Sequence, residues 1–111
     1  MSEGIKSVVY PATDLANAKA MFSAALNAEP VMDEPYYVGF QVNGTDIGLD
    51  PYGHKSGAVV YYHVDDIKGT LRTLVDAGAE VDTDVKDVGG GRQIAAVKDA
   101  DGNLIGLLQD A

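Results

Sequence analysis

The sequence has no cysteine and no tryptophan, and it has few basic side chains. The absence of cysteine excludes disulfides, thiolate metal sites and a cysteine nucleophile, although it says little about the compartment. No run of about 18 apolar residues occurs, and the opening MSEGIKS lacks the charged and apolar regions of a signal peptide. We therefore expect a cytoplasmic protein without a membrane partner.

The acidic side chains outnumber the basic ones, with 17 Asp and Glu against 8 Lys and Arg and a formal charge of −9. This charge repels a phosphate backbone, so we expect no nucleic-acid partner. The carboxylates are scattered without blocks of like charge, which is typical of side chains that keep a protein soluble. A second interpretation is that they attract a cationic ligand.

One motif occurs twice, as GTDIGL from Gly44 to Leu49 and as GNLIGL from Gly102 to Leu107. Upstream, four residues of the first half recur at a constant offset in the second: Val8, Tyr10, Asp14 and Leu15 are matched by Val60, Tyr62, Asp66 and Ile67. Two copies are too few for a solenoid. We predict a single domain over residues 1–111, with module one at about 4–50, a linker at 51–57 and module two at about 58–110.

Each module shows the same order of predicted elements. In module one, helical spacing of Leu15, Ala18 and Phe22 predicts a helix over residues 15–26, capped by Thr13 or Asp14. Asn43-Gly44 is a strong hairpin signal because both residues tolerate positive φ. The predicted strands cover residues 5–12, 31–32, 36–42 and 45–50.

In module two, Ile67, Leu71 and Leu74 predict the helix, with Gly78 at its end. Strands are predicted near residues 58–64, 80–85, 92–99 and 104–109. The pattern is βαβββ twice, so we expect the α+β class, with curved mixed or antiparallel sheets around a cup and both helices on the outer side.

Two segments resemble the vicinal oxygen chelate superfamily, which includes glyoxalase I, extradiol dioxygenases and bleomycin-resistance proteins. The opening IKSVVYPATDL is similar to the family's first strand and helix start, and VKDADGNLIGLLQ is similar to its closing DPDGN signature. The resemblance covers nearly the whole chain. It implies the paired βαβββ fold and a small-molecule ligand.

Enzymes of this family bind a divalent metal through four side chains, one on the first and one on the last strand of each module. Carried over by position, these ligands fall on Ser7, Gly48, Val59 and Gly106. None of these is an ordinary metal ligand, so we expect neither a metal nor a cofactor. A displaced site of His63, Asp50 and Asp46 stays open as an alternative, although strand geometry spreads these groups along the cup.

Strand alternation from these four positions defines the inner face of the cup. The predicted ligand-binding residues are Ser7, Phe40, Gly48, Val59, Tyr61, His63, Ala96 and Gly106. Phe40 is included as an aromatic side chain on a strand whose orientation the sequence leaves open. Such an apolar surface with a few polar groups is typical of a small-molecule pocket, and the glycines either leave room for a ligand or bend the sheets.

The sequence leaves open whether the protein is an enzyme and favours binding without catalysis, so no catalytic residue is predicted. The first hypothesis is a metal-independent protein that sequesters an aromatic or antibiotic-like molecule. The alternative is a lyase or isomerase that uses His63 and Tyr61, or an unorthodox metal site. A third is a degenerate domain that binds a partner protein. We also expect a homodimer, because a half-covered sheet leaves apolar surface to bury.

Overall fold

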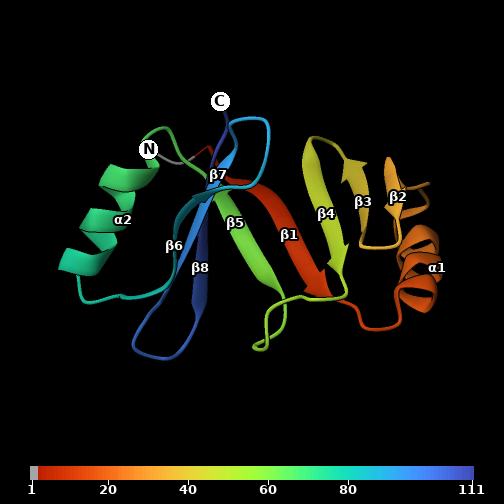
Figure 1. Cartoon of the computed structure of the whole chain (residues 1–111), viewed down its shortest axis with the longest axis horizontal. Coiled ribbons are helices and arrows are strands. Elements are labelled where there is room, and N and C mark those ends of the chain that lie inside the picture. Colours follow the sequence, from red (N-terminus) through yellow and green to blue (C-terminus); the bar gives the residue numbers. More distant parts are fainter. Residues whose placement is uncertain (1–2) are drawn as a thin grey trace. The chain divides into compact units, whose positions relative to one another are not determined.

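The computed structural model describes residues 3–111 and contains two βαβββ modules (Figure 1). Module one consists of β1 (Ile5–Pro11), α1 (Leu15–Leu26), β2 (Met32–Glu34), β3 (Tyr37–Val42) and β4 (Thr45–Asp50). Module two consists of β5 (Val59–His63), α2 (Ile67–Asp76), β6 (Glu80–Asp87), β7 (Gln93–Lys98) and β8 (Leu104–Gln109). The predicted α+β class and the repeated element order are confirmed. The chain forms two compact units. One consists of residues 7–59, and the other consists of residues 60–111 together with residues 3–6.

The sheet of module one has the strand order β2-β3-β4-β1, in which β1 runs parallel to β4 and the other neighbours are antiparallel. Asn43 and Gly44 form the turn between β3 and β4, with φ of 50° and 83°. Both residues tolerate positive φ, so the hairpin closes with only two residues. The pairs that follow, from Val42 with Thr45 onward, place Gly39 opposite Gly48.

Helix α1 packs on one face of this sheet. Its start is capped by Asp14, whose Oδ1 accepts a hydrogen bond from the Asn17 backbone N at 3.1 Å. Phe22 from α1 lies against Tyr10 with 4.9 Å between ring centroids. The core beneath the helix is formed by Ala12, Val38, Phe40 and Leu49.

Phe40 is therefore a core residue, only 1% exposed, and its predicted place on the ligand-binding face is wrong. The physical reason is the register of the hairpin. Phe40 lies opposite Ile47, and both side chains point to the helix side of the sheet because side chains alternate along a strand.

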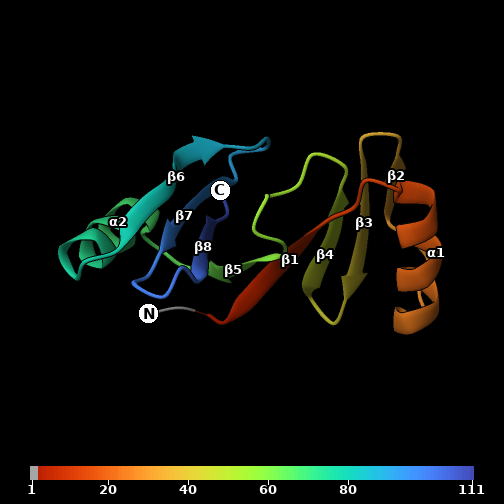
Figure 2. The ribbon, with the colours of Figure 1, turned by 90° about the horizontal axis from the view of Figure 1, so that it is seen from below.

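The sheet of module two repeats the plan, with β5 parallel to β8 and antiparallel pairs β8-β7 and β7-β6. Asp66 caps α2 by accepting a hydrogen bond from Gly69 N at 3.1 Å. Ile67 at the start of α2 packs with Ala95 and Leu107. Figure 2 shows α2 beside the strands of this sheet. Over residues 3–111, the structure contains no helix with the length and hydropathy needed to span a membrane.

The loop from β7 to β8 explains the closing signature of the sequence. Asp99 accepts hydrogen bonds from the backbone N and the side-chain Nδ2 of Asn103, each at 2.9 Å. The Asn103 side chain, followed by its backbone N–H, lowers the pKa of Asp99. These contacts hold the turn, so Asp99 and Asn103 have a structural role.

Candidate functional site

The face of module one opposite α1 is built from paired small residues. In the register of β1 and β4, Ser7 lies opposite Asp46 and Val9 lies opposite Gly48, and Gly39 of β3 lies on the other side of Gly48. Paired residues on neighbouring strands point to the same side of a sheet, so these residues share one face. Ser7 is buried there.

The ring of Tyr37 covers the two glycines of this face. A Cβ atom placed on Gly48 would meet the Tyr37 hydroxyl and lie 2.6 Å from its Cζ, and a Cβ on Gly39 would lie 3.4 Å from its Cε2. Any side chain at position 48 would displace the tyrosine. The phenol thus occupies the space into which a side chain from the last strand of the module would project.

Tyr37 is absent from the residues predicted for the site. The signal that identifies it is the two-residue turn Asn43-Gly44, which fixes the pairing of β3 with β4 by counting outward from the turn. The same count assigns Phe40 to the opposite face.

In module two, the structure brings three predicted residues together. Tyr61 lies opposite Gly106 on β8, and Ala96 of β7 lies on the other side of Gly106. A Cβ on Gly106 would lie 2.7 Å from Tyr61 Cδ1 and 2.6 Å from the backbone oxygen of Val60. Val59, two residues before Tyr61 on β5, is buried and shares its parity.

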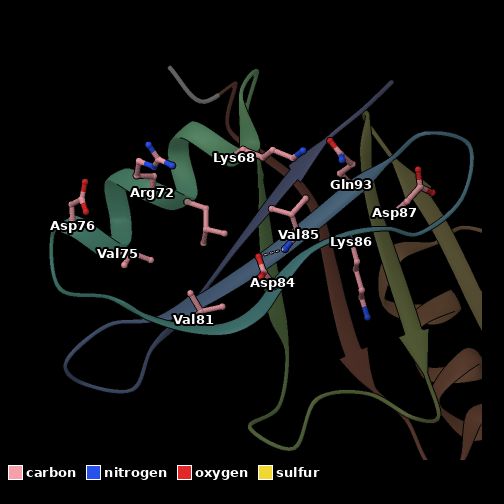
Figure 3. A pocket seen from close by; sticks show the side chains of 11 residues that line it. Lys68, Arg72, Val75, Asp76, Val81, Asp84, Val85, Lys86, Asp87 and Gln93 are labelled. Carbon is pink, nitrogen blue, oxygen red and sulfur yellow. Dashed lines mark hydrogen bonds between the residues drawn. The ribbon is translucent and has the colours of Figure 1, made fainter.

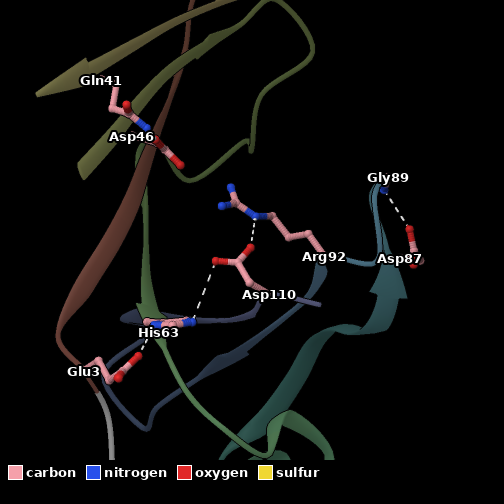
Figure 4. Close-up of polar contacts among 8 residues, drawn as sticks. All are labelled: Glu3, Gln41, Asp46, His63, Asp87, Gly89, Arg92 and Asp110. Carbon is pink, nitrogen blue, oxygen red and sulfur yellow. Dashed lines mark hydrogen bonds and ion pairs between the residues drawn. The ribbon is translucent and has the colours of Figure 1, made fainter. Parts of the chain in front are cut away.

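His63 lies at the end of β5 among charged groups from both ends of the chain (Figure 4). Its Nδ1 is 2.5 Å from Oε2 of Glu3, and its Nε2 is 3.8 Å from Oδ2 of Asp110. Arg92 Nε donates to the other oxygen of Asp110 at 2.6 Å. The backbone of His63 is also paired with Glu3 and Gly4 by two hydrogen bonds of 2.9 Å.

The environment of Asp110 keeps its carboxylate charged. The hydrogen bond from Arg92 lowers the pKa of Asp110, and the charges of Arg92, His63 and Lys6 act in the same direction against desolvation. Both nitrogens of His63 therefore face carboxylates. These partners come from the termini and the β6–β7 loop, and no motif in the sequence relates them to His63.

The sequence profile of the glyoxalase/bleomycin resistance protein/dioxygenase superfamily matches residues 4–107. The chain belongs to this superfamily. No curated protein matches the sequence.

Solved structures of low sequence identity share the fold of this superfamily member. A glyoxalase/bleomycin resistance protein/dioxygenase superfamily member from Vibrio splendidus 12B01 is 19% identical, with a TM-score of 0.73 and full coverage of both chains. Methylmalonyl-CoA epimerase from Mycobacterium tuberculosis is 21% identical, with a TM-score of 0.75 over 99% of this chain and 89% of the epimerase. A protein described as NAD-dependent benzaldehyde dehydrogenase from Legionella pneumophila is 16% identical, with a TM-score of 0.71 over 95% and 98%. At these identities the likeness establishes the fold, and the function depends on the residues of the site.

The residues present do not fit the divalent metal that superfamily enzymes bind. Ser7, Gly48, Val59 and Gly106 supply no carboxylate and no imidazole, and tyrosine rings cover the two glycines. Among residues 3–111 there is no group of three or more His, Asp or Glu side chains that could hold a metal ion.

The alternative metal site of His63, Asp50 and Asp46 would combine residues of the two compact units and stays a prediction. Asp46 accepts a hydrogen bond from Gln41 Nε2 at 3.1 Å, and Asp50 accepts one from Tyr52 N at 2.8 Å. Asp46 thus joins β4 to the neighbouring strand β3, and Asp50 stabilises the turn that follows β4.

Proposed function

We propose that this superfamily member binds a small aromatic or antibiotic-like molecule without a metal and without turning it over. The observation that carries the proposal is the pair of tyrosines, Tyr37 and Tyr61, whose rings lie over Gly48 and Gly106. In each module a phenol ring stands at the position where superfamily enzymes place a metal-binding side chain. The site therefore offers aromatic surface and hydroxyl groups in place of a charged metal.

The chemistry of these faces suits a flat organic ligand. Tyrosine rings interact with aromatic ligands by stacking or edge contacts, at roughly 0.5–1.5 kcal/mol for each pair beyond the burial of surface. Gly39 lies opposite Gly48 and Ala96 lies opposite Gly106, so only small side chains stand beside the two glycines that the tyrosine rings cover. The buried hydroxyl of Ser7 and the phenol hydroxyls provide the few polar contacts that orient a ligand. The net charge of −9 favours a cationic ligand.

The ion pair of His63 with Glu3 favours a second candidate, a lyase or isomerase that uses His63 and Tyr61. A carboxylate at Nδ1 fixes the orientation of an imidazole, as acid–base catalysis requires. However, Nε2 faces Asp110 at 3.8 Å, so a substrate would have to compete with a carboxylate for this nitrogen. We therefore favour ligand binding without catalysis over the lyase or isomerase.

We further propose that the protein is a cytoplasmic homodimer. Each module covers only one face of its own sheet with a helix. A second chain would bury the apolar surface that remains in so small a protein. Light scattering at micromolar concentration checks this, and a monomer would contradict it.

The proposal is tested by titrating EDTA-treated protein with a panel of aromatic antibiotics and aromatic metabolites, followed by calorimetry. We expect binding of at least one member of the panel, loss of affinity in Tyr37→Ala and Tyr61→Ala, and partial retention in the corresponding phenylalanine variants. Tyr52→Ala is the matched control, because Tyr52 is 88% exposed in the linker.

Equal loss of affinity in the Tyr52 variant, or no binding across the panel, would contradict the proposal. Conversion of a bound ligand to product by wild-type protein, lost in His63→Ala, would favour the enzyme instead.

A further inference from the structure

The two modules differ in how the helix is joined to the edge strand of its sheet. In module one, Lys19 of α1 forms an ion pair with Asp33 of β2, with 2.5 Å between Nζ and Oδ2. By the offsets of the repeated segments, Lys19 corresponds to Leu71 of α2 and Asp33 corresponds to Asp84 of β6. Leucine cannot pair with a carboxylate, so this bridge has no equivalent in module two.

A groove of about 650 Å³ lies between α2 and β6 in its place (Figure 3). Its apolar part is formed by Leu71, Val75, Val81 and Val85. Val75 and Val81 remain 42% and 43% exposed, one on the helix and one on the strand. The volume lies within the range of about 300–1,000 Å³ found for small-molecule pockets.

Three of the chain's eight basic side chains line this groove: Lys68, Arg72 and Lys86. Within residues 3–111 none of the three forms a side-chain ion pair, although the chain contains 17 acidic residues. Three acidic side chains also line the groove. Asp84 and Asp87 each accept a hydrogen bond from nearby backbone, from Val85 N at 2.8 Å and Gly89 N at 2.7 Å, and Asp76 lies at the opposite end of α2 from Lys68.

We propose that this groove is a binding site for an amphipathic monocarboxylate. Lys68 extends across the upper end of the groove toward Gln93, as Figure 3 shows, and these two side chains can donate hydrogen bonds to a carboxylate. The apolar tail then covers Val75 and Val81. The site is separate from the tyrosine-covered faces and does not depend on the function proposed for them.

The proposal is tested with three probes of equal chain length, octanoate, octylamine and 1-octanol, titrated into ¹⁵N-labelled full-length protein and followed by NMR. Octanoate should shift the amide signals of α2 and β6 and bind more tightly than the other two. Lys68→Gln should raise the octanoate Kd roughly tenfold, because it removes a charge-assisted hydrogen bond. Val81→Asp should weaken octanoate further by placing a charge on the apolar part.

Lys55→Gln is the matched control, since it removes a lysine from the linker and should leave the octanoate Kd unchanged. Three results would overturn the proposal: octylamine or octanol binding as tightly as octanoate, octanoate shifts confined to other parts of the chain, or an unchanged Kd in Lys68→Gln. If a variant fails to fold, the Kd values of octanoate, octylamine and 1-octanol for wild-type protein still test the proposal.

Discussion

Module one and module two have the same order of helices and strands, but the tyrosine that covers the equivalent glycine comes from a different strand in each. Gly48 and Gly106 are equivalent, and each is covered by a tyrosine. In module one the tyrosine comes from β3, the antiparallel neighbour of β4, whereas in module two it comes from β5, the parallel neighbour of β8. Ile94 of β7 stands where module one has Tyr37, and Val9 of β1 stands where module two has Tyr61.

The different positions of the two tyrosines show which features of the repeated module are retained in both copies. The caps, the strand order and the glycines recur because the fold requires them, and the tyrosines change strand while covering the same position. The two faces are thus chemically alike but are not related by the internal repeat. A ligand would contact a phenol from the antiparallel neighbour of β4 in module one and a phenol from the parallel neighbour of β8 in module two.

The largest expected effect comes from Gly106→Ala. Its Cβ would lie 2.6 Å from the backbone oxygen of Val60, which cannot move without shifting β5. We expect a loss of about 3 kcal/mol in the free energy of unfolding, measured with urea. Tyr61→Ala removes the ring contact at 2.7 Å but leaves the carbonyl, so it should reduce this cost only in part. Full recovery of stability in the double variant would contradict the role of the Val60 carbonyl.

Gly48→Ala provides the contrasting case. Here the three nearest atoms all belong to the Tyr37 side chain. We expect a loss of about 1–3 kcal/mol in the wild-type background and a much smaller one in the Tyr37→Ala background. A double-mutant cycle with no coupling between positions 37 and 48 would show that the ring does not lie over Gly48.

The helix caps should behave alike in the two modules. Asp14 and Asp66 each accept one backbone hydrogen bond of 3.1 Å at the start of a helix. Replacing either by alanine should lower the free energy of unfolding by about 1 kcal/mol. A difference of more than about 1 kcal/mol between the two variants would mean that the caps are not equivalent.

The smallest effect is expected for Asp110→Asn in module two. The pKa of Asp110 is lowered in the folded state, so its contribution is present above the unfolded pKa and is lost as the pH falls through the folded pKa. Because the side chain is 38% exposed, we expect less than about 1 kcal/mol at pH 7. Urea unfolding at pH 7 and pH 3 checks this: the variant should differ from wild type less at pH 3, and an equal difference would contradict it.

Much of the fold could be predicted from local signals. Helix α1 and strands β4 and β8 have the predicted bounds, because helical spacing and the turns at Asn43-Gly44 and residues 100–103 mark them clearly. Strand β6 extends to Asp87, beyond the predicted end at Val85, because it continues to pair with β7 across register shifts. Such irregular pairing depends on tertiary contacts and has no local signal.

The site was harder to predict for two different reasons. The orientation of Phe40 and Tyr37 followed from the hairpin register but required counting from the turn. The partners of His63 could not be found this way, because Glu3 and Asp110 meet it only in the folded chain. The position of the Tyr37 ring over Gly48 depends on side-chain conformation, which strand alternation does not determine.

We propose above that tyrosine rings stand in place of metal-binding side chains in both modules. Calorimetric titration of EDTA-treated protein with Zn²⁺, Mn²⁺ and Ni²⁺ tests it most directly. We expect no stoichiometric site for any of the three ions, and only weak binding with Kd values on the order of 1 mM or higher. One ion bound for each chain or each module at micromolar concentration would contradict it.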